Sequence, residues 1–134
     1  MTKIIFKDLP TPNIPVSWGE LIDKICILEI KQQNASNELV KTNVSTELVL
    51  LNNIITEDIF CDLNIKRLRS KLKKINQNIW DIEDEIRSRE SAGDFGKRFI
   101  ELARNTLKFN DERAKIKKKI NIKLNSEIVE EKLY

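Results

Sequence analysis

The stretch IKRLRSKLKKINQNIWDIEDEI, residues 65–86, decides the fold. Its apolar side chains recur at alternating spacings of three and four residues: Ile65, Leu68, Leu72, Ile75, Ile79, Ile82 and Ile86. This heptad spacing places them all on one face of an α-helix. A β-strand, whose side chains alternate with a period of two, would scatter them over both faces. The stretch therefore predicts a long helix over residues 63–89 with an apolar seam that needs a partner.

A second seamed stretch, residues 95–124, follows after a short turn. Gly93 suits the left-handed position that ends a helix, and Asp94 is placed to cap the next one. The seam continues at Phe95, Phe99, Leu102, Thr106, Phe109, Arg113, Ile116 and Ile120. A turn this short between two long helices predicts an antiparallel hairpin. The second helix also carries another apolar stripe, which we expect to pack against the first helix of the chain: Ile100, Ala103, Leu107 and Ala114.

The chain before the hairpin begins with an arm and a capped helix. Three prolines, Pro10, Pro12 and Pro15, make residues 1–16 an extended arm. Ser17 reads as an N-cap, and Glu20 three residues later completes a capping box, which predicts a helix over residues 18–33. Apolar residues cover most of that helix, so we expect burial on several sides. A polar strip remains at Glu20, Asp23, Lys24, Ile27 and Lys31.

The other segments have weaker patterns. Residues 34–46 are predicted to form a loop with a turn or two of helix near 36–40, followed by a short helix over residues 45–55 and a connection over 56–64. Residues 125–134 form a tail of ambiguous structure. Together the patterns predict one all-α domain over residues 1–134, a bundle of three or four helices built on the hairpin.

Composition excludes several classes of function. The chain has 134 residues, no histidine and a net charge of +3. Without histidine, and with Cys26 and Cys61 far apart, the usual zinc sites and histidine-based catalysis are excluded, and we expect no metal and no cofactor. No apolar run reaches the length of a membrane span and no signal peptide is evident. The default is a cytoplasmic protein with both thiols free and no membrane partner.

Several short motifs carry a resemblance to a known family. They are PVSWGELIDK (15–24), LEIK (28–31), WDIED (80–84), AGDFG (92–96), the NDxRAxxK pattern over 110–117 and the EEK ending with tyrosine over 130–134. By these motifs the chain resembles an uncharacterised bacterial and phage family, domain of unknown function 6165. The resemblance spans nearly the whole chain. It implies no activity, because the family has none assigned.

Charged residues on two helices suggest an anion pocket. Arg113 stands at a seam position where an apolar residue is expected, and Asn110 and Lys117 flank it one turn away; on the first helix, Glu20 and Lys24 are four residues apart. One interpretation is an ion-pair network that fixes helix register. The other is a site for a carboxylate or phosphate, in which Arg113 and Lys117 bind the anion.

Two surface features suggest binding. Trp80, Asp84 and Arg87 share a face of the hairpin's first helix, in the residue composition favoured at interfaces. The alternative is that Trp80 covers the first helix of the chain while Asp84 and Arg87 form a local ion pair. Basic residues also meet at one pole of the hairpin: Lys66, Arg67, Arg69, Lys115, Lys118 and Lys119. Such a pole suits the phosphates of a nucleic acid, an acidic protein partner or a second copy of the chain, or is simply a solvated surface.

These patterns favour a non-catalytic binding or assembly module that associates with itself. Two helices with several apolar faces exceed what one short bundle covers. The first alternative is a small-molecule enzyme or binder that uses the anion pocket. The second is a nucleic-acid accessory protein that uses the basic pole.

Overall fold

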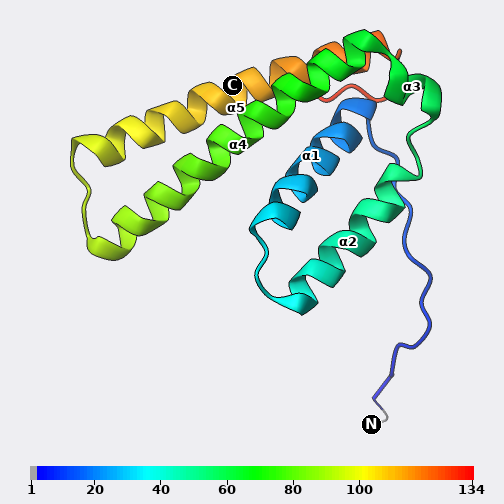
Figure 1. The fold of residues 1–134 in the computed structure, drawn as a ribbon, viewed down its shortest axis with the longest axis horizontal. Helices are drawn as coiled ribbons and strands as arrows, with labels where there is room; N and C mark the ends of the chain where they lie inside the picture. The colour runs from blue at the N-terminus through cyan, green and yellow to red at the C-terminus, as the bar shows by residue number, and fades with distance from the viewer. Residues whose placement is uncertain (1–2) are drawn as a thin grey trace.

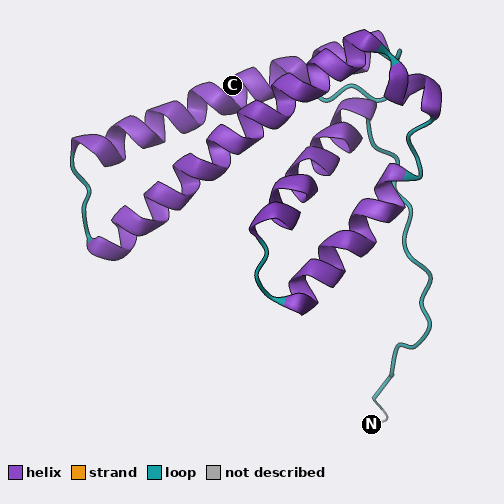
Figure 2. Ribbon diagram, in the orientation of Figure 1, coloured by secondary structure: helices purple, strands orange, loops and turns teal. Residues whose placement is uncertain are grey.

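The computed structural model describes residues 3–134, in which five helices and no strand occur (Figure 1). Met1 and Thr2, the first residues of the predicted arm, lie outside the described part of the chain. The helices are α1 (Trp18–Asn34), α2 (Glu38–Asn52), α3 (Glu57–Cys61), α4 (Leu63–Ala92) and α5 (Lys97–Lys123). The all-α class is therefore confirmed, and Figure 2 shows that loops only connect the helices or form the two ends of the chain.

Helices α4 and α5 form the predicted antiparallel hairpin and lie side by side along their length (Figure 1). Gly93 ends α4 in the left-handed conformation, with φ 68°, and its N–H donates to the carbonyls of Arg89 and Glu90. The prediction that Asp94 caps the next helix is wrong. α5 begins at Lys97 after Gly96, whereas the Asp94 carboxylate accepts hydrogen bonds from Arg89 and from the Gly96 N–H within the turn.

Helix α1 is the central element, because it is buried on two opposite faces. One face packs Ile22 and Cys26 against the seam of the hairpin. The opposite face packs against α2, and the buried residues of that second cluster are Leu21, Ile25, Leu28, Val44 and Leu48. The expectation that this helix is covered on several sides is confirmed.

The predicted loop over residues 34–46 is wrong, because most of it is helix. Asn37 caps α2, and its side-chain oxygen accepts from the N–H groups of Leu39 and Val40. Val44 and Leu48, one turn apart, supply the buried face of α2. The predicted connection before the hairpin also contains one helix, the single-turn α3.

Helix α1 contacts only half of the hairpin, and this divides the hairpin into two regions. We call residues 63–79 with 110–123 the base and residues 80–92 with 97–109 the tip. Every buried residue of α4 lies between Ile65 and Ile79, in the base. The tip projects beyond α1 and α2 (Figure 1). The prediction that the second stripe of α5 packs on α1 is therefore wrong for its tip residues: Ile100 is 56% exposed and Leu107 is 71% exposed.

Candidate functional site

Two of the predicted anion-pocket residues, Arg113 and Lys117, lie beside a fully buried carboxylate, Asp23. Arg113 donates from Nε to Asp23 Oδ1 at 3.0 Å and from Nη2 to Oδ2 at 2.5 Å. Asn76 Nδ2 donates to Oδ1 at 2.9 Å, and Lys117 Nζ lies 3.9 Å from Oδ2. Three helices thus contribute to one polar cluster, with Asp23 on α1, Asn76 on α4 and the two cations on α5.

The charges in this cluster balance. Lys117 Nζ also donates to Glu20 Oε2 at 2.5 Å, so that two cations face two carboxylates. The hydrogen bonds with Asp23 raise the pKa of Arg113 above its ordinary value, although partial burial acts in the opposite direction. An incoming anion would have to displace Asp23 or Glu20. The arrangement therefore favours the interpretation that the cluster fixes helix register.

Two predicted members of the anion pocket lie outside the ion-pair cluster. Lys24 is exposed and forms no ion pair with any residue between 3 and 134. Asn110 donates to the Thr106 carbonyl within α5. A hollow of about 820 Å³ does lie beside the cluster, between α5 and the C-terminal tail, and Asn110, Arg113 and Lys117 line it. A ligand site at this place stays a prediction.

The start of α1 is anchored to α5 at the edge of the same cluster. Gly19 donates its N–H to Asn121 Oδ1 at 2.7 Å, and a Cβ at position 19 would lie 2.5 Å from the Lys117 carbonyl oxygen. Only glycine allows this approach. Ser17 is the N-cap as predicted, accepting the Glu20 N–H at 3.0 Å. The reciprocal half of the capping box is wrong, because the Glu20 carboxylate binds Lys117 instead.

The C-terminal tail also contacts the start of α1 and the end of α5. It carries no helix after α5 and runs back toward the start of α1. Glu130 accepts hydrogen bonds from the Ser17 hydroxyl and from Asn121 Nδ2. Burial alone would raise the pKa of Glu130, but these hydrogen bonds hold it below its ordinary value. Lys132 pairs with Asp111 at 2.5 Å. Three stretches that carried the family resemblance, 15–24, 110–117 and 130–134, therefore meet at one place.

Sequence reasoning missed Asp23 as the centre of the cluster. Asp23 was assigned to a polar strip, yet it is 0% exposed. A signal was available: Glu20 and Asp23 are spaced three apart on α1, and Lys117 and Arg113 are spaced four apart on α5. Two antiparallel helices with those spacings bring each carboxylate to one cation.

The predicted interface residues lie on the tip of the hairpin. Trp80 is partly buried, whereas Asp84 and Arg87 are exposed. Across residues 3–134 no ion pair joins Asp84 to Arg87, so the local pair offered as an alternative is not formed. A binding role for this face stays a prediction.

The residues of the predicted basic pole do not form one surface, because Lys115 and Lys119 line a different hollow from Lys66 and Arg69. On one side, Lys115 and Lys119 of α5 face Lys71 and Lys74 of α4 across a shallow groove of about 340 Å³. The groove is lined by Lys71, Lys74, Ile75, Glu112, Lys115, Ile116 and Lys119. On the other side of α4, Lys66 and Arg69 face α3. Arg67 is exposed, and Lys118 pairs with Glu131 of the tail.

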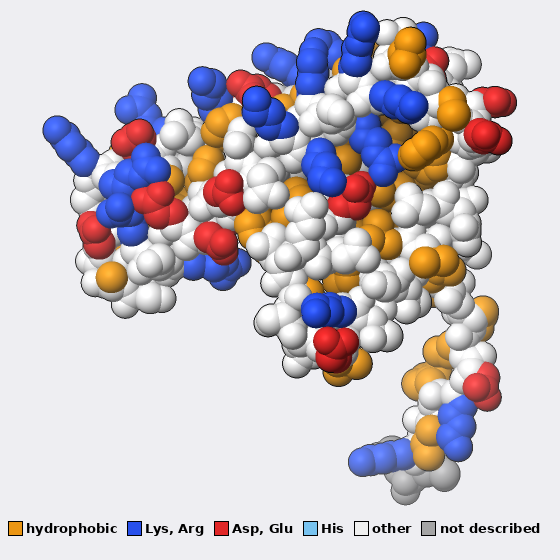
Figure 3. All heavy atoms as spheres, viewed as in Figure 1, with side chains coloured by type: hydrophobic (Ala, Val, Ile, Leu, Met, Phe, Trp, Pro, Cys, Tyr) orange, Lys and Arg blue, Asp and Glu red, His pale blue; other side chains and the backbone are white. Residues whose placement is uncertain are grey.

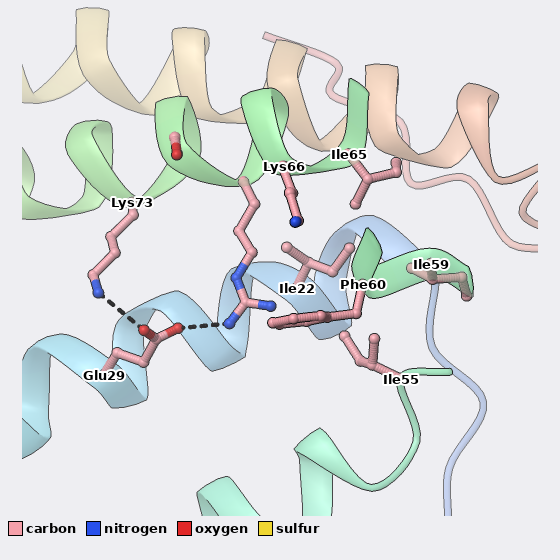
Figure 4. A pocket seen from close by; sticks show the side chains of 10 residues that line it. Ile22, Glu29, Ile55, Ile59, Phe60, Ile65, Lys66 and Lys73 are labelled. Carbon is pink, nitrogen blue, oxygen red and sulfur yellow. Dashed lines mark hydrogen bonds and ion pairs between the residues drawn. The ribbon is translucent and has the colours of Figure 1, made fainter. Parts of the chain in front are cut away.

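The second of these surfaces is a cavity that sequence reasoning missed, and we call it the Phe60 pocket. It has a volume of about 370 Å³ and lies where α1, α3 and α4 meet (Figure 4). Glu29 accepts hydrogen bonds from Arg69 Nη2 and from Lys73 Nζ, both at 2.9 Å. Burial alone would raise the pKa of Glu29, but these two bonds hold it below its ordinary value.

Two further observations concern metals and membranes. Among residues 3–134, no three metal-ligating side chains of histidine, cysteine, aspartate or glutamate gather in one place. The helices described here do not combine the length and apolar character that a bilayer crossing requires.

Comparison with known proteins gives one match. The model of a family described as "Family of unknown function (DUF6165)" matches residues 13–134, which confirms the resemblance inferred from the motifs. The first twelve residues, most of the arm, lie outside the match. No curated protein and no solved structure matches the chain.

Proposed function

This chain belongs to DUF6165, a family of unknown function, and we propose that it is a non-catalytic helical module that assembles with a second copy of itself. The observation that carries the proposal is the N-terminal arm. Residues 3–16 extend away from the helices, and their large apolar side chains are exposed by 70% or more at Ile4, Ile5, Phe6, Leu9 and Ile14 (Figure 3).

The arm is suited to docking on another chain. Burial of one large apolar side chain contributes about 1.5–3 kcal/mol, and burial of several of them offsets much of the conformational entropy that is lost when the segment becomes ordered. Pro10, Pro12 and Pro15 stiffen the arm, which lowers that cost. Fully extended, the arm reaches roughly 45 Å, far enough to cross to a neighbouring copy.

Sedimentation velocity over a range of protein concentrations tests this proposal. We expect the weight-average mass of the full chain to rise above that of a monomer. Phe6→Asp should shift the association to at least tenfold higher concentration, because a charge would enter an apolar contact. The matched control is Ile122→Asp, at a residue that is 69% exposed on α5, and it should associate as the wild type does. A monomer at every concentration would contradict the proposal.

A second candidate function, nucleic-acid binding, is favoured by the groove between Lys71, Lys74, Lys115 and Lys119. None of these four lysines forms an ion pair within the described chain, and Glu112 is the one carboxylate in the lining. If the four bind duplex phosphates, affinity should fall about a hundredfold between 50 and 200 mM salt. Fluorescence anisotropy with a labelled duplex measures this. Lys71→Gln should weaken binding, and the control Lys41→Gln on α2 should not.

We further propose a cytoplasmic setting. It is supported by the two free cysteines, buried Cys26 and exposed Cys61, since thiols persist in a reducing compartment.

A further inference from the structure

The Phe60 pocket combines an apolar interior with a charged rim. Its apolar lining comes from α1, α3, α4 and the loop before α3, and consists of Ile22, Ile55, Ile59, Phe60 and Ile65. Its volume of about 370 Å³ falls within the range of small-molecule sites. In Figure 4 the labelled side chains of Ile22, Phe60 and Lys66 point toward the same space.

The rim carries more positive than negative charge. Lys66, Arg69 and Lys73 line the pocket with a single carboxylate, Glu29. Glu29 is already shared by Arg69 and Lys73. Lys66 forms no ion pair with any residue from 3 to 134. An adjoining hollow adds one more carboxylate, Glu57, which leaves an excess of positive charge around the whole depression.

Two of these cations converge on one aromatic ring. Lys66 Nζ and Arg69 Cζ each lie 5.8 Å from the centroid of the Phe60 ring. Each contact is attractive by itself, because the face of the ring is negative. Two like charges on one ring nevertheless repel each other, and only Arg69 has a carboxylate partner. A bound anion between them would remove that repulsion and complete the hydrogen bonding of both groups.

We propose that the Phe60 pocket binds a small organic acid with one carboxylate and an apolar or aromatic body. The carboxylate is held by Lys66 and Arg69, and the body lies on Phe60 and the surrounding isoleucines. Charge argues against the N-terminal arm as the occupant, because residues 3–16 contain Lys3 and Lys7 but only one carboxylate, Asp8. The proposal does not depend on self-association.

An NMR titration of the full chain with 4-phenylbutyrate tests the proposal. We expect saturable shifts of backbone amides around Ile22, Phe60 and Ile65, with affinity in the millimolar range or tighter. The neutral analogue 4-phenylbutan-1-ol has the same apolar body without the charge. It should bind about five- to tenfold more weakly, because it loses the charge-assisted hydrogen bonds.

Matched variants separate this site from a general charge effect. Lys66→Gln should weaken 4-phenylbutyrate binding about five- to tenfold and leave binding of the alcohol unchanged. The control is Lys74→Gln, on the same helix but lining the opposite groove, and it should bind as the wild type does. Both lysines are exposed, so both variants are expected to fold.

Several outcomes would overturn the proposal. Equal affinity for the acid and the alcohol would identify an unselective apolar hollow. An equal loss in Lys66→Gln and Lys74→Gln would identify long-range attraction alone. Shifts confined to other residues, or no shift at ten-millimolar 4-phenylbutyrate, would show that the Phe60 pocket does not bind the acid.

Discussion

The base and the tip of the hairpin each bind a carboxylate through two cations, but in different surroundings: the carboxylate at the base is Asp23 of α1, and the one in the tip is Glu85 of α4. In the base, Asp23 accepts from Arg113 and lies near Lys117, with its side chain 0% exposed. In the tip, Glu85 accepts from Arg89 and Arg98, with its side chain 35% exposed. Hydrogen bonds from Arg98 and Arg89 lower the pKa of Glu85 to about 2. The number of partners is similar, and burial is what differs.

The difference teaches that coverage by α1, rather than the heptad seam itself, decides which part of the hairpin is most stable. The same heptad pattern runs through both halves of α4, yet Ile65, Leu72 and Ile79 are buried whereas Ile86 is only partly buried. In the base, α1 covers the groove between the two long helices. In the tip, Leu102 is buried at 1% exposed, but the other seam residues are only partly buried, so they remove less area from water.

The largest expected effect comes from the two carboxylates. Asp23→Asn should lower the free energy of unfolding by about 3 kcal/mol, because it leaves the Arg113 charge partly buried without its partner. Glu85→Gln should change stability little, because water can solvate Arg89 and Arg98 once the carboxylate is gone. Urea unfolding of both variants measures the contrast. Equal losses would contradict the division into base and tip.

The apolar seam provides a second contrast. Leu72→Ala should cost about 3 kcal/mol, because Leu72 is 0% exposed and its truncation leaves a cavity. Ile86→Ala should cost about 1 kcal/mol, since that site is already partly open to water. Both values come from the same unfolding experiment. If Ile86→Ala were as damaging as Leu72→Ala, a further contact would have to cover the tip.

Two glycines sharpen the comparison at the level of the backbone. Gly19→Ala should cost about 1–3 kcal/mol, because the added Cβ would collide with the Lys117 carbonyl and push α1 away from the base. Gly96→Ala, in the turn at the end of the tip, should change stability by less than about 0.5 kcal/mol, because its nearest neighbour would be Asp94 Oδ1 at 3.4 Å. Thermal unfolding of the two variants is the measurement. A neutral Gly19→Ala would mean that α1 is not held this closely.

A smaller change in the free energy of unfolding is expected when the pH is lowered, because the Glu29 carboxylate at the Phe60 pocket becomes protonated. The pKa of Glu29 is lowered in the folded protein from its ordinary value of 4.5. Its contribution to stability is therefore present above pH 4.5 and is lost as the pH falls below that value. The stability difference between the wild type and Glu29→Gln should narrow between pH 5 and 3. A difference that stays constant over this range would show that the carboxylate contributes nothing through its charge.

The smallest perturbation is chemical labelling of the thiols, which needs no mutation. Burial raises the pKa of Cys26 to about 12, with Arg69 acting in the opposite direction. At pH 8 Cys26 therefore stays protonated and enclosed between α1 and the base, whereas Cys61 is exposed. We expect one thiol per native chain to react with a disulfide reagent, and two in urea. Rapid reaction of both in the native protein would show that α1 separates easily from the base.

Local signals in the sequence predicted most of the fold. The heptad spacing, Gly93 and Ser17 each act over a few residues, and the hairpin and the first helix followed from them. Residues 38–46 were missed because α2 buries one narrow face, around Val44 and Leu48, among polar neighbours. The signal of Asn37 as a cap was present in the sequence and could have been used.

The candidate sites were harder to predict, because they depend on how distant helices meet. Arg113 and Lys117 were found from their unusual seam position, but Asp23 needed the register of α1 on α5. The basic pole was predicted as one surface, although its members on α4 differ in their angle around the helix. Phe60 gave no signal, since its neighbours in the pocket come from α1 and α4.

Native-state hydrogen exchange of the full chain tests the central claim, that stability is concentrated in the base, most directly. Amides of α4 between residues 65 and 79 should exchange at least about a hundredfold more slowly than those between 82 and 92, because only the former require global unfolding. Uniform protection along all of α4 would contradict the claim. It would mean that the tip and the base open as one unit and that α1 does not set the difference.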